Sequence, residues 1–434
     1  MLTAGHAPLD LERRDPSTRW RRWRRSLAFL GPGLLVAVGY VDPGNWSTDL
    51  AAGSQFGYLL LGVVILSSGA AMLMQSLSAR LGVASGLDLA QATRWLHPRA
   101  VIPLWLLAEL AMVATDLAEV LGAAIALQLL FGLPLVAGVL LTGLDVLIFL
   151  GLARSGWRGV EAVVGALLAV VAACLVFELV LARPDPAAVA RGLIPDFRGL
   201  AHPEVLYVGI GIVGATIMPH NLYLHSALVR SSEAPGDTRA ARRTIREATL
   251  GSVVTLSGAM LVNAAILLLA AAAFHGNGQR DVVDFSQAYR LLAPVLGSAV
   301  AAPIFAVALL AAGQSATITG TMAGQVVVSG FLNLQLQPWV RRLVTRGLAL
   351  VPALAVIAFA GERSVTSLLI GSQVVLSMQL PFAMVPLLRA TAHPGLMGSL
   401  ASPRWLRAAG WITTAVIVTM NAALLWLIAR GGWA

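Results

Sequence analysis

The chain of 434 residues has no lysine and one cysteine, and only 12% of its residues are charged. So low a charge density, with 58% apolar residues and a mean hydropathy of +0.80, excludes an ordinary water-soluble globule. The lack of lysine also excludes a Gly-x-x-x-x-Gly-Lys phosphate loop. Cys174 lies inside an apolar stretch and says little about redox compartment. The composition predicts an integral membrane protein.

Apolar stretches of roughly 17 to 25 residues, enough to cross about 30 Å of hydrocarbon, recur along the whole chain. We expect eleven membrane-spanning helices, of which the eighth is too long for a plain span. Their approximate cores are Ser26–Leu50, Tyr58–Ala79, Val101–Leu127, Leu133–Leu152, Val160–Leu181, Tyr207–Val229, Leu250–Phe274, Pro294–Leu332, Leu343–Ala360, Val365–Leu388 and Leu406–Ile428.

The arginines predict the orientation of these spans. If the N-terminus is cytoplasmic, 23 of the 30 arginines fall in cytoplasmic segments and 7 on the other side. That asymmetry is what the positive-inside rule gives for a cytoplasmic N-terminus and an external C-terminus. The basic, tryptophan-containing run Arg19–Arg25 abuts the first span, so we expect it to anchor to the lipid bilayer and not to nucleic acid.

Two helix breaks occupy matching places in the chain. Asp42-Pro43-Gly44-Asn45 interrupts the first span and Met218-Pro219-His220-Asn221 the sixth. Five spans separate the breaks, so the second copy enters the membrane from the opposite side, as in secondary transporters built from inverted repeats. The predicted organisation is a cytoplasmic arm (1–25), a first five-helix repeat (26–182), an external loop (183–206), a second five-helix repeat (207–389), and an eleventh helix with the C-terminus (390–434).

The breaks expose groups that bind cations. A proline frees the carbonyl four residues before it, which is Gly39 in the first break and Ala215 in the second. Such carbonyls are tolerated in a membrane only where protein, water or an ion satisfies them. Beside them lie the carboxylate of Asp42, the amide of Asn45 and the thioether of Met218. This mixture suits a divalent cation.

The thioether narrows the choice of ion. Mg²⁺ and Ca²⁺ prefer oxygen ligands, whereas sulfur favours Mn²⁺, Fe²⁺, Co²⁺ and Cd²⁺. The alternative is that Met218 only packs and Asp42 is structural. A carboxylate near the bilayer centre costs at least about 2.5 to 3.5 kcal/mol, however, so a functional role is the default for Asp42.

The two breaks resemble signature motifs of the Nramp family, the proton-coupled divalent-metal transporters. A third stretch, from Gly313 to Gln325 with Gly330-Phe331-Leu332 and Arg341-Arg342 after it, is similar to the family's transport motif. The likeness runs from about Leu30 to Leu427 and is greatest to bacterial manganese transporters. It implies an all-α LeuT-type fold and import of Mn²⁺, and often Fe²⁺ or Cd²⁺, with a proton, at a cell membrane.

The resemblance also implies a set of metal ligands. The third position of the family's signature is commonly alanine and is Gly39 here. Because this residue would contact the metal through its backbone carbonyl, we expect the glycine to change little beyond making the break more flexible. Gln373 matches a ligand that the family recruits in one state of its cycle. The implied set is Asp42, Asn45, Met218, Gln373 and the carbonyls of Gly39 and Ala215.

Proton movement needs further groups, and the third span supplies three carboxylates. Glu109, Asp116 and Glu119 lie within about 80° of one helix face. We expect cations from the start of the ninth span as their partners: Arg341, Arg342 and Arg346. The alternative interpretation is a set of fixed salt bridges between these spans.

The resemblance points to Asp116, Glu119 and the Arg341-Arg342 pair as a proton exit route. We add Asp42, Glu109 and His220 as proton-pathway candidates. His225, five residues after His220, is about 140° around a helix and should not form a chelating pair with it.

Other classes of function fit less well. A sodium-coupled amino-acid symporter would share the fold, but Asp42 and Met218 would be poor neighbours for a substrate carboxylate. A passive metal-ion channel is not excluded by the sequence, whereas an enzyme is not indicated, because no zinc-ligand set with a base is found. Family relatives that carry magnesium or aluminium lack the methionine. We expect no cofactor, metal ions and protons as the substrates, and a monomer.

Overall fold

The chain is described here by a computed structural model, which covers residues 30–144, 156–196, 199, 202–230, 238–334, 337–361 and 364–430. The arm predicted for residues 1–25 lies outside these ranges. Within them the chain is all-helical, with no strand. The helices are α2 (Leu30–Gly39), α3 (Pro43–Phe56), α4 (Leu61–Ser85), α5 (Leu89–Leu96), α6 (Val101–Phe131), α7 (Leu135–Thr142), α9 (Gly156–Ala182), α10 (Pro186–Gly192), α11 (Pro203–Ile217), α12 (Pro219–Leu228), α13 (Thr238–Ala273), α14 (Phe285–Leu296), α15 (Ala301–Leu332), α16 (Pro338–Ala360), α17 (Val365–Ala392), α18 (Pro394–Met397) and α19 (Arg404–Ala429), with 3-10 turns η1 (Pro98–Ala100), η3 (His275–Asn277) and η5 (Gly398–Leu400).

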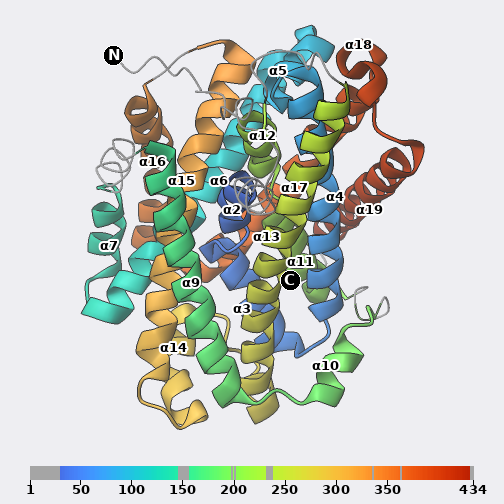
Figure 1. Ribbon diagram of the computed structural model, residues 1–434. Coiled ribbons are helices and arrows are strands. Elements are labelled where there is room, and N and C mark those ends of the chain that lie inside the picture. The colour runs from blue at the N-terminus through green and yellow to red at the C-terminus, as the bar shows by residue number, and fades with distance from the viewer. Residues whose placement is uncertain are drawn as a thin grey trace, which may run out of the picture.

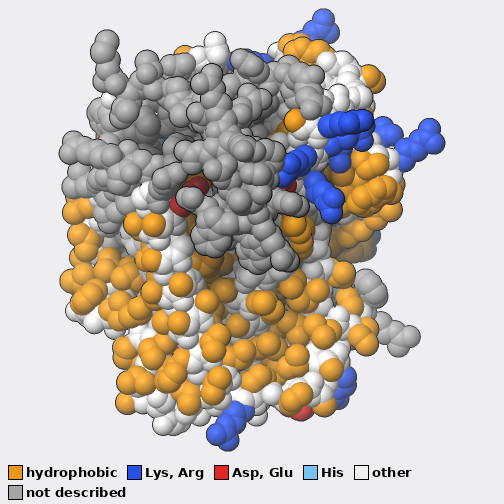
Figure 2. All heavy atoms as spheres, viewed as in Figure 1, with side chains coloured by type: hydrophobic (Ala, Val, Ile, Leu, Met, Phe, Trp, Pro, Cys, Tyr) orange, Lys and Arg blue, Asp and Glu red, His pale blue; other side chains and the backbone are white. Residues whose placement is uncertain are grey.

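The long helices form one bundle, with the short helices α5 and α18 at its upper end and α10 at its lower end in Figure 1. Nearly all of α3, α11 and α12 is buried, whereas α9 and α19 expose most of their length. Small residues permit close approach, as where Gly82 of α4 lies against the backbone carbonyl of Ser226 in α12. Below the grey atoms, the face in Figure 2 is largely covered with apolar side chains, as lipid contact requires.

Eight of the described helical stretches are long and apolar enough to cross a membrane. Of the other three expected spans, the first is interrupted between α2 and α3, and the ninth carries arginines in α16 that leave only Leu343–Phe359 as a continuous apolar helix. The fourth is described only as α7, because its remainder lies outside the described residues.

The prediction of one long eighth span from Pro294 to Leu332 was wrong. Pro294 belongs to α14, which ends where Gly297 adopts a left-handed backbone with φ of 64°. The span itself is α15, beginning at Ala301. The apolar residues before Ala301 belong to the separate helix α14, which packs against α15.

Arginine contacts tie several connecting segments together at one end of the bundle. Arg230, just after α12, lies 3.5 Å from the carboxylate of Asp88 at the start of α5. Arg242 of α13 donates to the backbone carbonyl of Ser399 in η5. In Figure 1 this is the upper end, which carries α5 and α18.

Candidate metal site

The first break places a carboxylate at the start of a half-helix. Asp42 is the N-cap of α3, and its Oδ1 accepts from the backbone N–H of Asn45 at 2.8 Å and from Asn45 Nδ2 at 2.9 Å. The residue is 1% exposed, and Asp42 Oδ2 has no hydrogen-bond partner among the described residues. A buried acceptor without a donor is costly, so this oxygen is available to a cation.

The second break carries backbone strain. Met218 joins α11 to α12 with φ of 41°, a left-handed conformation that non-glycine residues seldom adopt. Such strain costs about 1 to 3 kcal/mol and concentrates at functional sites. The break holds the Met218 side chain fully buried at the junction of the two half-helices.

The two breaks meet. The amide Nδ2 of Asn45 donates to the backbone carbonyl of Ala215 at 3.0 Å, although the residues are 170 positions apart. This is the carbonyl that proline at position 219 frees from the helix ladder. The hydroxyl of Tyr40 adds a longer contact of 3.4 Å to the carbonyl of Ile217. The side chain of one broken helix thus satisfies the exposed backbone of the other.

Three further amide side chains surround this junction. Asn263 of α13 donates to the carbonyl of Tyr40 at 2.9 Å and to Asn45 Oδ1 at 3.3 Å. Gln373 of α17 lies against Gly44, where a Cβ would overlap its amide. Asn221 of α12 lies in the same way against Gly39. These amides line the site from α12, α13 and α17.

Each of these amides has a buried oxygen without a hydrogen-bond partner in the described part of the chain: Asn221 Oδ1, Asn263 Oδ1 and Gln373 Oε1. Together with Asp42 Oδ2 they give four acceptors in excess of donors, an arrangement that a hard or borderline cation would satisfy. No three His, Cys, Asp or Glu side chains come together in the described ranges, which separates the site from a zinc-type centre.

The residues of the predicted ligand set lie on the two broken helices or, for Gln373, against the first of them, and their role as metal ligands stays a prediction. The sequence reasoning did not assign roles to Asn221 and Asn263. Asn221 stands inside the second break motif, and Asn263 is an asparagine in an otherwise apolar span, a signal of function that could have been used.

The carboxylates of α6 take arginine partners from α16. Arg341 Nη2 lies 3.0 Å from Glu109 Oε2 and 3.1 Å from Oε1, and Trp105 Nε1 donates to the same Oε1 at 3.1 Å. Glu109 is thus in a partly buried ion pair in which one arginine nitrogen contacts both carboxylate oxygens. The side chain of Arg342 lies outside the described residues.

A second pair lies deeper. Arg346 Nη1 is 3.8 Å from Glu119 Oε2, which accepts from the hydroxyl of Thr317 at 3.0 Å. Arg346 also donates to the backbone carbonyl of Asp116 at 3.3 Å. Asp116 and Glu119 are both buried, so the predicted partnership of α6 carboxylates with the arginines of α16 is found for Glu109 and Glu119.

The two histidines of α12 take different partners. His220 Nδ1 lies 3.3 Å from Thr115 Oγ1 on α6, which turns the ring toward the carboxylate-bearing helix. His225 contacts Gln75 Oε1 at 2.9 Å and Ser252 Oγ at 3.1 Å. The two rings are not a chelating pair, as the helical spacing predicted.

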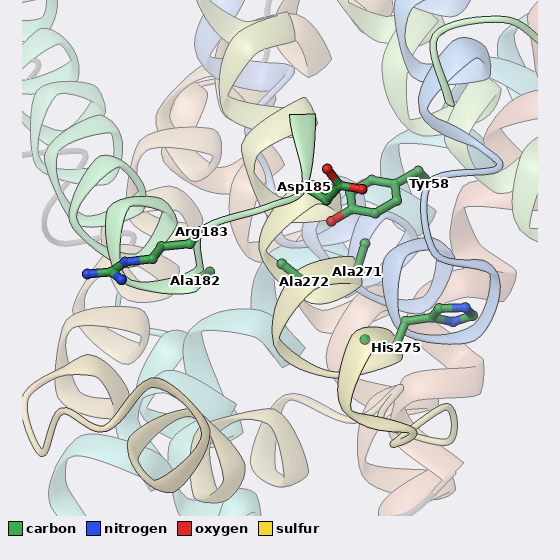
Figure 3. Close-up of a pocket in the computed structure, with 8 residues that line it drawn as sticks. Tyr58, Ala182, Arg183, Asp185, Ala271, Ala272 and His275 are labelled. Carbon is green, nitrogen blue, oxygen red and sulfur yellow. The ribbon is translucent and has the colours of Figure 1, made fainter. Parts of the chain in front are cut away.

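A separate cavity of about 230 Å³ lies at the end of α9 (Figure 3). Tyr58, Asp185 and His275 are among the residues that line it, and the Tyr58 ring lies beside the Asp185 carboxylate. The Asp185 carboxylate already caps α10 by accepting from two backbone N–H groups, and His275 Nδ1 lies 3.0 Å from the carbonyl of Ser54. The cavity is therefore distinct from the junction of the broken helices.

Comparison with known proteins identifies the family of the chain. The sequence profile of Nramp, described as natural resistance-associated macrophage protein-like, matches residues 33–427. A divalent metal cation transporter MntH of Xanthomonas campestris pv. campestris is 54% identical over 431 residues, covering 99% of this chain and 96% of the relative. A crystal structure of the Eremococcus coleocola manganese transporter superposes with a TM-score of 0.87 at 39% identity, over 96% of this chain and 89% of that one.

A more distant likeness bears on the fold alone. The structure of MhsT in complex with L-phenylalanine gives a TM-score of 0.62 at 15% identity, over 91% of this chain and 98% of that one. The predicted LeuT-type, all-helical fold is thereby confirmed. The profile match and the 54% identical relative show that the chain belongs to the Nramp family of metal transporters, and is not an enzyme.

Proposed function

We propose that the chain imports divalent transition metal ions, Mn²⁺ foremost and Fe²⁺, Co²⁺ or Cd²⁺ besides, together with protons. The observation that carries this proposal is the Asn45 amide, which joins the buried carboxylate of Asp42 to the freed carbonyl of Ala215. Both broken helices thus contribute to one site. The relatives named as divalent metal cation and manganese transporters support the same class of substrate.

The charge balance at the site supports a cation. No arginine occurs in α2, α3, α11 or α12, the four half-helices that form the junction. No arginine of these half-helices therefore offsets a charge on the Asp42 carboxylate, and an incoming metal would neutralise that charge. In this proposal the ligands are Asp42, Asn45, Met218, Gln373 and the carbonyls of Gly39 and Ala215, with the thioether selecting against Ca²⁺ and Mg²⁺.

For the coupled proton, the route lies along α6. Glu119 has a hydroxyl and a guanidinium beside it, and His220 faces the same helix through Thr115. With Asp42 and Asp116 these groups provide protonatable sites leading away from the metal. The Glu109–Arg341 pair and Arg342 belong to the far end of this route, where a released proton would meet the cytoplasm.

The transport cycle in this proposal is alternating access between two inverted five-helix repeats, 26–182 and 207–389. The N-terminus is cytoplasmic and the C-terminus external, in a monomer in the cell membrane. The end of the bundle at which arginines hold α5 and η5 would then face the cytoplasm, in keeping with the positive-inside rule.

The test is Mn²⁺ uptake into proteoliposomes with an inward proton gradient and a negative internal potential, with a pH-sensitive dye inside. We expect saturable uptake accompanied by acidification, and neither signal in Asp42→Ala. Uptake by the wild type without acidification would mean that the protein is a passive channel or a carrier that is not coupled to protons. If the wild type moves no Mn²⁺, or Asp42→Ala moves it normally, the proposed function is wrong.

A further inference from the structure

The second break contains a hydrogen bond to sulfur. Asn221 Nδ2 donates to Met218 Sδ at 3.4 Å, one turn back along α12, and both side chains are fully buried. Asn221 Oδ1 has no partner among the described residues. With the amide reversed, this oxygen would face the sulfur with no hydrogen between them. The sulfur contact therefore fixes which way the amide points.

The position of this amide depends on Gly39 at the end of α2. A Cβ on Gly39 would overlap Asn221 Nδ2 and come within 3.0 Å of its Oδ1. The Asn221 amide thus occupies the space that an alanine methyl group at position 39 would take. The contact joins the last residue of one half-helix, α2, to the first turn of another, α12.

We propose that Asn221 is the positioning residue for the Met218 thioether, and that Gly39 provides the space that lets it act. This inference rests on the proposed function, since it assigns a specificity-determining role at the same site. Asn221 engages one lone pair of the sulfur and so leaves the other directed at the ion. It holds the thioether in one rotamer, which matters because methionine is the most flexible of the apolar side chains.

The consequence is selectivity for soft cations. A thioether held in place before the ion arrives loses less side-chain entropy on binding than a free one. That advantage applies to ions that bond to sulfur, such as Cd²⁺, and not to Ca²⁺, which takes oxygen ligands. Losing Asn221 should therefore change the ratio of affinities for Cd²⁺ and Ca²⁺, beyond any general weakening of the site.

The experiment measures Cd²⁺ and Ca²⁺ affinities of the purified full chain by calorimetry, and the sulfur shell of bound Cd²⁺ by X-ray absorption. The variants are Asn221→Ala, Gly39→Ala, Met218→Ala and their double combinations. We expect Asn221→Ala to lower the Cd²⁺/Ca²⁺ affinity ratio by about tenfold and to weaken the cadmium–sulfur signal. Gly39→Ala should do the same by displacing the amide, a larger effect than the sequence alone predicts for a residue that offers only its carbonyl. It should add nothing to Asn221→Ala.

The matched control is Asn421→Ala, which removes another buried amide that has no contact with Met218; Asn421 of α19 is bonded to Ser377 of α17. Its affinity ratio should equal that of the wild type. An unchanged ratio in both Asn221→Ala and Gly39→Ala, or an Asn221→Ala effect of full size in the Met218→Ala background, overturns the inference. If Asn221→Ala does not fold, Gly39→Ala decides alone. Failure of the wild type to bind either metal would instead refute the proposed function.

Discussion

Asp42→Asn is expected to stabilise the metal-free protein and to abolish its response to Mn²⁺. Asparagine has almost the shape of aspartate, and its oxygen can still accept the two hydrogen bonds from Asn45 that Oδ1 accepts now. The substitution replaces Oδ2, a buried oxygen with no partner among the described residues, with an uncharged amide nitrogen. It removes a charge that no arginine of the four half-helices offsets.

The magnitude follows from two opposing terms. Removing an unpaired aspartate charge from the membrane interior relieves about 3 kcal/mol. Two hydrogen bonds to a charged acceptor become bonds to a neutral one, a loss of about 1 kcal/mol each. The net expectation is an increase of about 1 kcal/mol in the free energy of unfolding of the metal-free protein.

Thermal unfolding of the purified full chain in detergent measures both effects, through the fluorescence of its 11 tryptophans. At a Mn²⁺ concentration of about 100 times Kd, the wild type should gain about 2.7 kcal/mol. The variant should gain nothing. The order of stability of the two proteins should therefore reverse when Mn²⁺ is added.

Asp49→Asn is the matched control. Asp49 is a second buried carboxylate, about two helical turns beyond the break in α3, and its Oδ2 has no hydrogen-bond partner within the described ranges. Its neutral variant should keep the stabilisation by Mn²⁺. A metal-free Asp42→Asn protein that is less stable than wild type by 1 kcal/mol or more would refute the reasoning, because the carboxylate would then be a satisfied structural group. Stabilisation of Asp42→Asn by Mn²⁺ to the same extent as the wild type would refute it as well.

The ion-pair network gives two further predictions. Arg346→Ala leaves Glu119 buried without this cation and should lower the free energy of unfolding by about 3 to 5 kcal/mol. The double variant Arg346→Met/Glu119→Gln should recover most of that stability in thermal unfolding. Its Mn²⁺ uptake should still occur without acidification. If the double variant acidifies the vesicles as much as the wild type does, Arg346 and Glu119 are not part of the proton route. Gly324→Ala places a methyl group on the guanidinium of Arg341 and should cost about 1 to 3 kcal/mol. Gly258→Ala, where nothing lies within 4 Å, should instead be neutral or slightly stabilising in the same unfolding assay.

Sequence reasoning reached furthest where covalent structure decides the outcome. A proline has no N–H whatever its surroundings, so the chain alone identifies Ala215 as the residue whose carbonyl leaves the helix ladder. The structure brings Asn45 to that carbonyl. The choice of α6 and α16 as ionic partners could also be made in advance, because Glu109 and Arg341 are costly in a membrane unless paired.

The other contacts of the site depend on how the helices are rotated against one another, which the sequence does not specify. Asn263 reaches Asn45 across 218 residues, and nothing in the local sequence of α13 fixes which face it presents. The end of α14 was missed for a different reason. Apolar residues continue through Gly297, so hydropathy alone does not separate a helix capping the bundle from the span that follows.

The Asn45 amide has one more consequence. Its nitrogen now serves Asp42 and the Ala215 carbonyl, and its oxygen accepts from Asn263. An ion held by both the Asn45 oxygen and the Ala215 carbonyl needs that oxygen where the nitrogen now lies. The side chain must turn half-way round, release Asn263 and give up its donor role. One amide therefore joins the two broken helices in this structure, and an ion bound by the proposed ligands would require that amide to reverse.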